Sequence, residues 1–584
     1  MYYSDWYECP DTLQKKESLL SNFTDLEIIK GVTKIKAIHM TEMQNYINTL
    51  LVDKGLDAIS FTEIIAKQTK LSGWIDHVNE IRDAVDLLGR SHEDWVELSG
   101  ALPRANAISQ LQDIVIGYSK VILTVSGEEG LPSDCIVSLI NTDDGSVIER
   151  FKYTETSIIK ILPDISYRIE CSPSSKYNVA PVSEVIISRA CEISYITLNY
   201  RNAYRYGFKR EKANSDPSTR ITYLYDAEDM TPMSVNLTTG EPDYGSWQTF
   251  IEEVCRPVML KYDGSVDYEL DHNDQTKKMD GTASDIANTA YEGNAMVEFR
   301  KYKWVKRYED EQYEYVIFSD VQWDDTYNSY AFTNEDGAIS DVMYFGMFKG
   351  RVISSKLRSI GTGAITTGNT MTKERQYAEA NGSGYDITSK CMRDYICDIL
   401  TLLSKNDSSD VFGFGVINAS SRLAVGSLIS QGAFYGKNTN KTTDIKTLYI
   451  EGFWGNVAER LNGLFYSSSK NGFIVKMTPP YNTTGDGYFE TGISFSSDLS
   501  DSYMTTSSCT DVGGWLPTAG GGQNGTYTSD GLWITRSVVG CPRVGGNYNT
   551  GTTAGARTLI LNHPHTTATE WCAARLTYIP TINS

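Results

Sequence analysis

Apolar positions in the first hundred residues recur at the spacing of helices. Thr41-x-x-Gln44 and Ser60-x-x-Glu63 have the form of capping boxes, in which two side chains satisfy free backbone N–H groups at the start of a helix. Apolar residues follow each box, and Gly55 separates the two. The pattern therefore predicts two helices in this region.

A third predicted helix carries an apolar heptad repeat. Its apolar residues are spaced alternately three and four apart: Leu71, Trp74, Val78, Ile81, Val85 and Leu88. Such a repeat forms the seam of a coiled coil, and the mixture of β-branched and large residues allows a trimer. An amphipathic helix that packs on its own domain has the same pattern. We expect residues 1–110 to be a helical region for attachment and trimerisation.

Between residues 111 and 202 the period changes to that of strands. Short β-branched runs are separated by turn residues such as Asp143-Asp-Gly145. The runs are Val121–Val125, Cys135–Ile140, Ser157–Leu162, Tyr167–Cys171, Val185–Ser188 and Ile193–Leu198. Their spacing predicts an immunoglobulin-like β-sandwich, which resembles the spacer modules of surface proteins. We expect it to provide reach and no binding site.

Residues 203–584 differ in composition from the preceding segment and are rich in Tyr, Trp, Asp and Gly. A helix is expected near Ser389–Leu403, with one apolar side formed by Tyr395, Ile396, Ile399, Leu402 and Leu403. Tryptophans punctuate the rest of the segment. We expect Trp454, Trp515 and Trp533 to be largely buried scaffold residues. Trp571 could be a core residue or an aromatic ring of the binding surface, and the core is the favoured interpretation.

Composition narrows the functional class. The chain has 584 residues, 40% of them hydrophobic and 22% charged, which suits several folded domains. A net charge of −21 argues against binding to nucleic acid or to an anionic membrane. No stretch has the length of a membrane span, and Met1-Tyr-Tyr-Ser-Asp5 does not begin an export signal. We therefore expect a chain made in the cytoplasm, without membrane insertion.

The stretch 544–576 displays polar and aromatic residues between glycines. Gly545, Gly546, Gly551 and Gly555 are the pivots. Tyr, Asn, Thr, His and Arg side chains make a versatile binding surface, although a plain polar surface loop has the same composition. The candidate ligand-binding residues are Asn547, Tyr548, Asn549, Thr552, Arg557, Thr558, Ile560, His563 and His565.

This stretch resembles the variable region of proteins that are targets of diversity-generating retroelements. The matching frame is Gly545-Gly546, Tyr548, Gly551, Ala554-Gly555-Ala556 and Leu561-Asn562. The chain departs from that family at Asn562-His-Pro-His565 and at Ala573-Ala574-Arg575. The departure leaves open whether a retroelement still diversifies the stretch. The resemblance implies a C-type-lectin fold that displays the residues between the frame positions.

Further phrases extend this resemblance over residues 203–584. Met296–Phe299, Tyr344–Phe348 and Leu357–Gly361 resemble the lectin-like domain of the formylglycine-generating-enzyme type, and Trp454-Gly455-Asn456 is close to a signature of that superfamily. Tyr206–Arg210 and Asp280–Asp285 resemble sequence segments of tail proteins of phages and prophages. The implied architecture is a multidomain α+β protein with N-terminal helices and a short coiled coil, an immunoglobulin-like β-sandwich, and a C-terminal C-type-lectin-like α/β head.

Other constellations favour structural roles. Cys541 and Cys572 lack the local motif of thiol catalysis, and buried thiols are the favoured interpretation. Glu241-Pro-Asp243 resembles a calcium motif of lectins, but it lies in a glycine-bounded turn. Four carboxylates lack the spacing of an EF-hand, which favours a solvated loop. They are Asp263, Asp267, Asp271 and Asp274. We expect neither a metal nor another cofactor.

From these observations and resemblances we expect the chain to be a receptor-binding protein of a phage tail fibre, without enzymatic activity. Its expected partners are a glycan or protein receptor on a host cell surface, other virion tail proteins that hold residues 1–110, and two further copies of itself. Its expected location is the virion. The alternatives are a tail-spike depolymerase that uses paired carboxylates, for which no internal repeat is found, and a bacterial variable adhesin.

Overall fold

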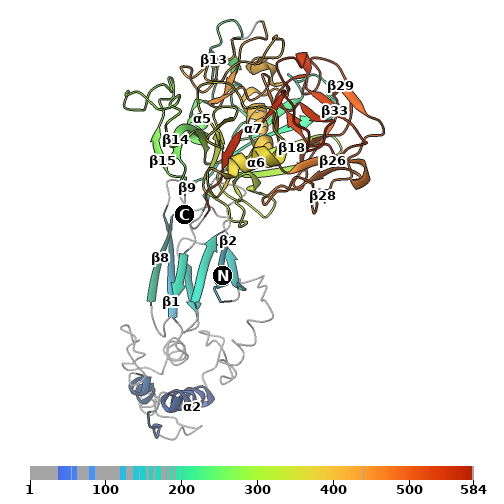
Figure 1. The fold of residues 1–584 in the computed structure, drawn as a ribbon. Coiled ribbons are helices and arrows are strands. Elements are labelled where there is room, and N and C mark those ends of the chain that lie inside the picture. The colour runs from blue at the N-terminus through green and yellow to red at the C-terminus, as the bar shows by residue number, and fades with distance from the viewer. Residues whose placement is uncertain are drawn as a thin grey trace. The chain divides into compact units, whose positions relative to one another are not determined.

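The computed structural model describes residues 37–53, 56–61, 78–85, 119–126, 136–143, 145–152, 157–161, 166–171, 179–180, 184–187, 193–199, 201–437 and 440–581. The chain divides into two compact units, Met1–Ala203 and Tyr204–Ser584 (Figure 1). The sequence placed a boundary between residues 202 and 203. We call the second unit the head.

The helices of the first unit differ from the capping pattern. Helix α2 spans Ala37–Asp53 and contains Thr41, so Thr41 is not its N-cap and this capping-box prediction is wrong. The second proposed box begins at Ser60, which is not helical, and runs into residues outside the described ones. The side chain of Asn48 binds both the N–H and the carbonyl of Ile59, at 2.8 and 2.9 Å, and so fixes the segment that follows α2.

The described part of the heptad repeat is already covered within one chain. Residues 78–85 are helical, and Val78, Ile81 and Val85 have no exposed surface. Leu71, Trp74 and Leu88 lie outside the described residues. This burial favours the alternative interpretation, an amphipathic helix packed on its own domain. A homotrimer remains a prediction, but the heptad repeat no longer supports it.

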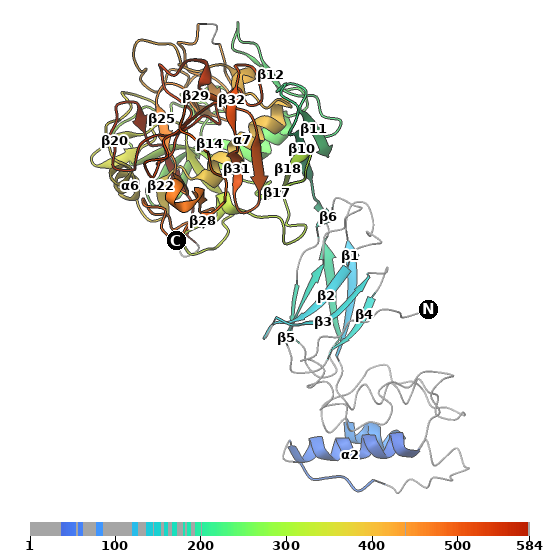
Figure 2. The same ribbon diagram turned by 90° about the vertical axis from the view of Figure 1, so that its right-hand side faces the viewer.

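The described strands of the first unit form a three-stranded sheet, a four-stranded sheet and a separate pair (Figure 2). The strands are β1 Ser119–Ser126, β2 Ile136–Asn141, β3 Val147–Lys152, β4 Ser157–Ile161, β5 Ser166–Cys171, β6 Val179–Ala180, β7 Glu184–Ile187, β8 Ile193–Asn199 and β9 Arg201–Asn202. The six predicted runs all form strands, and Val121, Leu123, Val137 and Ile169 are fully buried. The sequence missed β3, because its charged residues interrupt the apolar pattern.

The strand order of this unit differs from the immunoglobulin order. One sheet is β4-β1-β8 and the other is β3-β2-β5-β7, with β6 paired to β9 separately. In an immunoglobulin domain the first strand pairs with the second. Here β1 instead pairs with β4 and, in parallel, with β8. The sandwich-like pair of sheets is therefore as expected, but its topology is not the immunoglobulin one.

The head is built mainly of β-sheet. A six-stranded sheet contains β15 Val266–Glu269, β14 Cys255–Lys261, β16 Gly293–Phe299, β19 Met343–Gly346, β37 Leu576–Tyr578 and β22 Tyr385–Ile387, in that order. A seven-stranded sheet contains β32 Gly520–Gly522, β29 Leu499–Met504, β33 Gly531–Ile534, β35 Leu559–Leu561, β34 Arg543–Val544, β25 Ala458–Arg460 and β36 Cys572–Ala573. The predicted variable stretch thus supplies β35, β36 and the second residue of β34 to this sheet.

Smaller sheets complete the head. The four-stranded sheet is β11 Ile221–Tyr225, β10 Arg205–Glu211, β18 Tyr313–Ser319 and β17 Trp304–Glu309, and the three-stranded sheet is β26 Leu464–Ser467, β27 Gly472–Val475 and β28 Phe489–Glu490. The strand pairs are β12 Ser234–Val235 with β13 Pro242–Asp243, β20 Arg351–Ile353 with β21 Lys356–Arg358, β23 Lys446–Thr447 with β24 Ile450–Glu451, and β30 Ser507–Thr510 with β31 Gly514–Pro517.

The helices of the head are α5 Gln248–Val254, α6 Met371–Glu379 and α7 Lys390–Ser404, with short 3-10 turns at Tyr330–Phe332, Ser409–Phe412, Ser468–Lys470 and Gly551–Thr553. Helix α7 begins where the sequence predicted, because Ser389 caps it. The expected apolar side is present, but every residue of α7 is buried, so its polar side is enclosed as well, which the sequence did not predict. Its charged residues have internal partners: Lys390 pairs with Asp394 at 2.5 Å, and Arg393 donates to the carbonyls of Phe453 and Ala556.

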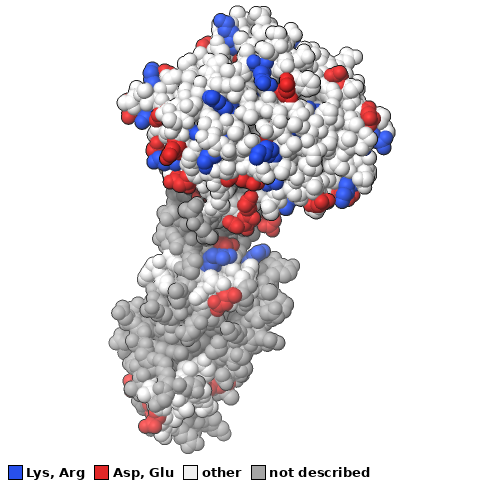
Figure 3. Space-filling model, in the orientation of Figure 1, with Lys and Arg blue, Asp and Glu red and all other residues white. Residues whose placement is uncertain are grey.

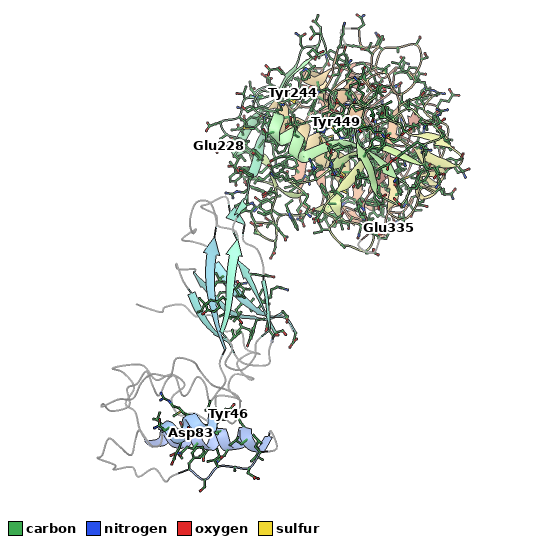
Figure 4. All side chains as sticks on the ribbon, turned by 90° about the vertical axis from the view of Figure 1, so that its left-hand side faces the viewer. Tyr46, Asp83, Glu228, Tyr244, Glu335 and Tyr449 are labelled. Carbon is green, nitrogen blue, oxygen red and sulfur yellow. The ribbon has the colours of Figure 1, made fainter. Side chains whose placement is uncertain are left out.

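The core of the head runs around α7. Tyr395 of α7 packs edge-to-face against Phe299, Phe318 and Phe332, with ring centroids 5.4 to 6.0 Å apart. In Figure 4 the buried Tyr449 lies within the mass of side chains, whereas the exposed Glu228 and Glu335 lie at its rim. Among the described residues, no helix combines the length and hydropathy that a membrane span requires.

Candidate binding surface

The glycines of the terminal frame have the backbone role that their spacing suggested. Gly546 has φ +69°, and a Cβ there would lie 2.7 Å from the Cβ of Ala554. Gly555 is tighter still, since a Cβ would collide with the carboxylate of Asp530. Side chains at these positions are therefore excluded by strain or by space. The frame therefore consists of consecutive tight turns, with the 3-10 turn Gly551–Thr553 at its centre.

The candidate residues between the glycines divide into two groups. Asn549 is exposed, while Asn547, Tyr548, Thr552, His563 and His565 are partly exposed. Arg557, Thr558 and Ile560 are buried, with exposed fractions of 7%, 0% and 8%. The prediction that these last three are displayed to a ligand is wrong.

Arg557 is buried because it belongs to an internal ion network. Its Nη2 lies 2.6 Å from Asp398, which also pairs with Arg307 at 2.9 Å, and its guanidinium lies 4.6 Å from the ring centre of Trp515. Burial raises the pKa of Asp398, but Arg307 and Arg557 outweigh this effect and hold the pKa below its ordinary value. The arginine thus stabilises a charge in the core.

The other two buried candidates hold the frame itself. The hydroxyl of Thr558 accepts a hydrogen bond from the N–H of Gly555 at 2.8 Å and donates one to the carbonyl of Thr553 at 2.6 Å. Ile560 lies in β35, between β33 and β34 of the seven-stranded sheet. Both residues therefore serve the fold of the stretch.

The two histidines lie in a different setting from Tyr548. The carbonyl of His563 accepts from the N–H of Cys541 at 2.8 Å, and that of His565 accepts from Met371 at the start of α6 at 3.0 Å. Tyr548 instead donates its N–H to the carbonyl of Asn456 at 2.9 Å. Only Asn547, Tyr548, Asn549 and Thr552 therefore remain together as a candidate surface, within one turn system.

A second loop lies against these four residues. The N–H of Ala419 donates to the carbonyl of Tyr548 at 2.9 Å, and the N–H of Gly551 donates to the carbonyl of Ile417 at 3.0 Å. We define the loop–frame surface as eight of the exposed or partly exposed polar residues of the loop 417–428 and of the frame: Asn418, Ser420, Ser421, Arg422, Asn547, Tyr548, Asn549 and Thr552. The sequence analysis did not identify this loop, which lacks any helical or strand period.

Buried polar side chains clamp the loop 417–428 from below. The amide of Asn456 binds both the N–H and the carbonyl of Leu423, at 2.9 and 3.3 Å. The carboxylate of Glu451 accepts from the N–H groups of Gly426 and Leu428, at 2.7 and 2.9 Å. The backbone of an exposed loop is thereby fixed at three successive points.

The far end of the loop is held by a buried lysine. Lys446 donates to the carbonyls of Leu428 and Gln431, at 2.8 and 3.0 Å, and to the side chain of Gln275. Burial lowers the pKa of Lys446 to about 7 and raises the pKa of Glu451. Burial and then Glu451 raise the pKa of Asp444, which binds Asn456, to about 7. Burial of these three ionisable groups costs free energy of folding. Their hydrogen bonds to the loop and to Asn456 offset part of that cost.

The alternative sites take the structural roles that the sequence favoured. Cys541 and Cys572 are buried free thiols, and burial raises their pKa to about 11 and about 12. Each of the carboxylates Asp263 and Asp274 accepts from the backbone two residues later, as in a turn. No group of three potential metal ligands occurs in the described part of the chain.

The tryptophans only partly follow the expectation. Trp454 and Trp515 are buried, Trp533 is partly buried, and Trp571 is 50% exposed. The prediction of Trp571 as a core residue is therefore wrong, because it precedes β36 at the edge of the seven-stranded sheet.

On the face of the head in Figure 3, acidic and basic side chains are interspersed, so this face has no large patch of a single charge sign.

Comparisons with known proteins add no family. No family model matches the chain, and no curated protein matches it. Among solved structures it is similar to the shaft pilin spaA of Lactobacillus rhamnosus GG (13% identity, 29% of this chain, 68% of the pilin, TM-score 0.13). A streptococcal ancillary pilin (12%, 36%, 60%, TM-score 0.16) and a protein described as an adhesin of Bacteroides ovatus (9%, 39%, 78%, TM-score 0.15) are similar at the same level. TM-scores this low carry no argument about fold or function.

Proposed function

We propose that this chain is a receptor-binding protein of a phage tail fibre, which attaches the virion to a host cell through the loop–frame surface of a C-type-lectin-like head. One observation carries the proposal. Asn456, Glu451 and Lys446 are buried, yet their polar atoms bind the backbone of an exposed loop. A surface that is ordered before binding loses less entropy when its ligand arrives.

The chemistry of the surface suits recognition. Tyr548 offers a flat ring with few rotatable bonds, while Asn418, Asn547 and Asn549 offer both donors and acceptors. Its contributing segments are joined by main-chain hydrogen bonds, so side chains can vary without loss of the scaffold. In this proposal the head binds and does not cleave, the virion is its location, and residues 1–110 contact other tail proteins.

Adsorption of labelled protein to a panel of bacterial strains tests the proposal. The double variant Tyr548→Ala, Asn549→Ala should lose binding, because truncation of an aromatic anchor costs about 2 kcal/mol or more at an interface. Tyr195→Ala is the matched control, since Tyr195 is a 76% exposed tyrosine of the first unit. Equal adsorption of both variants and the parent protein, with folding confirmed by thermal melting, would overturn the proposal.

A further inference from the structure

Where the loop 417–428 meets the chain before β36, an arginine of the loop, Arg422, hydrogen-bonds the residue that precedes an exposed tryptophan, Trp571. Trp571 is 50% exposed, but its backbone is held, since the N–H of Ala458 donates to its carbonyl at 3.0 Å. The next residue, Cys572, begins β36, which pairs with β25 in parallel. The indole is therefore displayed from a rigid sheet edge.

The guanidinium of Arg422 is anchored through one nitrogen only. Its Nη1 donates to the hydroxyl of Thr367 at 2.9 Å and to the carbonyl of Glu570 at 3.0 Å. Glu570 precedes Trp571, so the guanidinium lies next to the tryptophan backbone. Within the described part of the chain, Nε and Nη2 of Arg422 make no hydrogen bond or ion pair, and the contact with Glu570 is to its carbonyl and not to its carboxylate.

The position of Arg422 is fixed from both sides. The following residue, Leu423, is held by Asn456 through its N–H and its carbonyl. The side chain is held by Thr367 and Glu570. An arginine with a pinned head and an open Nε–Nη2 edge presents two parallel donors, which is the arrangement that binds a carboxylate in a bidentate manner.

We propose that Arg422 and Trp571 form a subsite for a carboxylated sugar of an acidic glycan. The sugar carboxylate accepts two hydrogen bonds from Nε and Nη2 of Arg422, and the apolar C–H face of the sugar ring packs on the indole of Trp571. Ser420, Ser421 and Thr566 are exposed nearby in sequence and supply hydroxyls for the sugar hydroxyls. A bare phosphate satisfies the arginine but leaves the ring without a partner.

This inference deepens the proposed function, on which it rests for the location of the glycan at a cell surface. Its test is independent of cells. The full chain is titrated by calorimetry with galacturonate tetramer, with sialic acid tetramer, and with the carboxyl-reduced form of the first. The acidic sugars should bind with Kd of about 1 mM or tighter, and reduction of the carboxyl groups should weaken binding about tenfold or more.

Matched variants assign the binding to the two residues. Arg422→Gln and Trp571→Ala should each weaken it about tenfold, and Arg422→Lys should fail to restore it because lysine lacks the planar fork. The controls are Arg536→Gln, an exposed arginine that also donates to a backbone carbonyl, and Phe489→Ala, an aromatic residue 53% exposed. Both controls should bind as the parent protein does.

Four results would overturn the inference: no binding of either acidic sugar at about 1 mM, equal binding of the reduced sugar, equal loss in the controls, or equally tight binding of inorganic phosphate or a tetraglutamate peptide. Adsorption by the loop–frame surface can survive each of these results. Conversely, sugar binding that persists in the Tyr548→Ala, Asn549→Ala variant, together with unchanged adsorption by that variant, would place attachment at Arg422 and Trp571 and would remove the frame residues from the proposed receptor contact.

Discussion

The guanidinium of Arg557 lies 2.6 Å from the carboxylate of Asp398 inside the head, although the two residues are 159 positions apart in sequence. Asp398 belongs to α7 and Arg557 to the terminal frame. The pair therefore ties the frame to the most enclosed helix of the head. Its consequence is that the frame contains both residues available to a ligand and residues on which the fold depends.

Arg557→Ala should destabilise the head, whereas Tyr548→Ala should not. Removal of one partner from a buried ion pair leaves Asp398 without one of its two arginines, and costs about 3 kcal/mol or more. Truncation of the partly exposed Tyr548 should change the free energy of unfolding by less than about 0.5 kcal/mol. Urea denaturation of the two variants measures both values. Similar stabilities would contradict the assignment of Arg557 to the core.

Gly546→Ala should cost more stability than Gly551→Ala. Both glycines have positive φ, +69° and +73°, so both substitutions introduce backbone strain of about 1 kcal/mol. Only at Gly546 does the new methyl group also meet another side chain, the Cβ of Ala554 at 2.7 Å; at Gly551 nothing lies within 4 Å. The difference in melting temperature isolates the steric part. Equal melting temperatures would show that the frame can relax around Gly546.

Glu451→Gln should loosen the loop 417–428 while the head stays folded. Gly426 and Leu428 donate to different oxygens of the carboxylate, so a glutamine in the same place would turn its NH2 donor toward one of these two N–H groups. We expect hydrogen exchange across the loop to accelerate about tenfold or more, because its opening then costs less free energy. Glu490→Gln, at an exposed glutamate of β28, is the control. Unchanged exchange in the Glu451 variant would refute the clamp.

Acid should remove the stability that Glu459 provides. Burial raises the pKa of Glu459, but Arg575 and Lys349 outweigh it and hold the pKa at about 2, against an ordinary value of 4.5. A carboxyl with a depressed pKa binds fewer protons in the folded state, so its contribution of about 3 kcal/mol is present above pH 4.5 and is lost as the pH falls toward 2.

The comparison of the parent protein with Glu459→Gln measures this contribution. The stability gap between the two should be largest near pH 6 and should narrow as the pH is lowered below 4.5. A gap that is constant from pH 6 to about pH 3 would mean that Glu459 titrates normally in the folded protein.

Local patterns predicted the parts of the fold that depend on near neighbours. The β-branched run Val121–Val125 predicted β1, and the spacing of apolar residues within 389–403 predicted α7, because both signals act over a few residues. The glycines of the frame were also informative, since a positive φ is a local requirement.

The rest of the candidate site depends on partners that no local pattern reveals. Arg557 has the composition of a display residue, and only the distant Asp398 makes it a core residue. The loop 417–428 is ordered by Asn456 and Glu451, which follow it on another segment and look unremarkable in sequence. Trp571 has the size of a core residue, but the sheet that contains β36 ends there.

The position of β37 sets the order in which the head can be made. This strand, Leu576–Tyr578, lies inside the six-stranded sheet, between β19 and β22, and the neighbouring Arg575 binds the carbonyl of Gly346, 229 residues earlier. A ribosome delivers β19 and β22 long before the strand that joins them. Until then the nascent head exposes unpaired strand edges, which pair readily with other chains. We therefore expect those edges to need protection until β37 has been made.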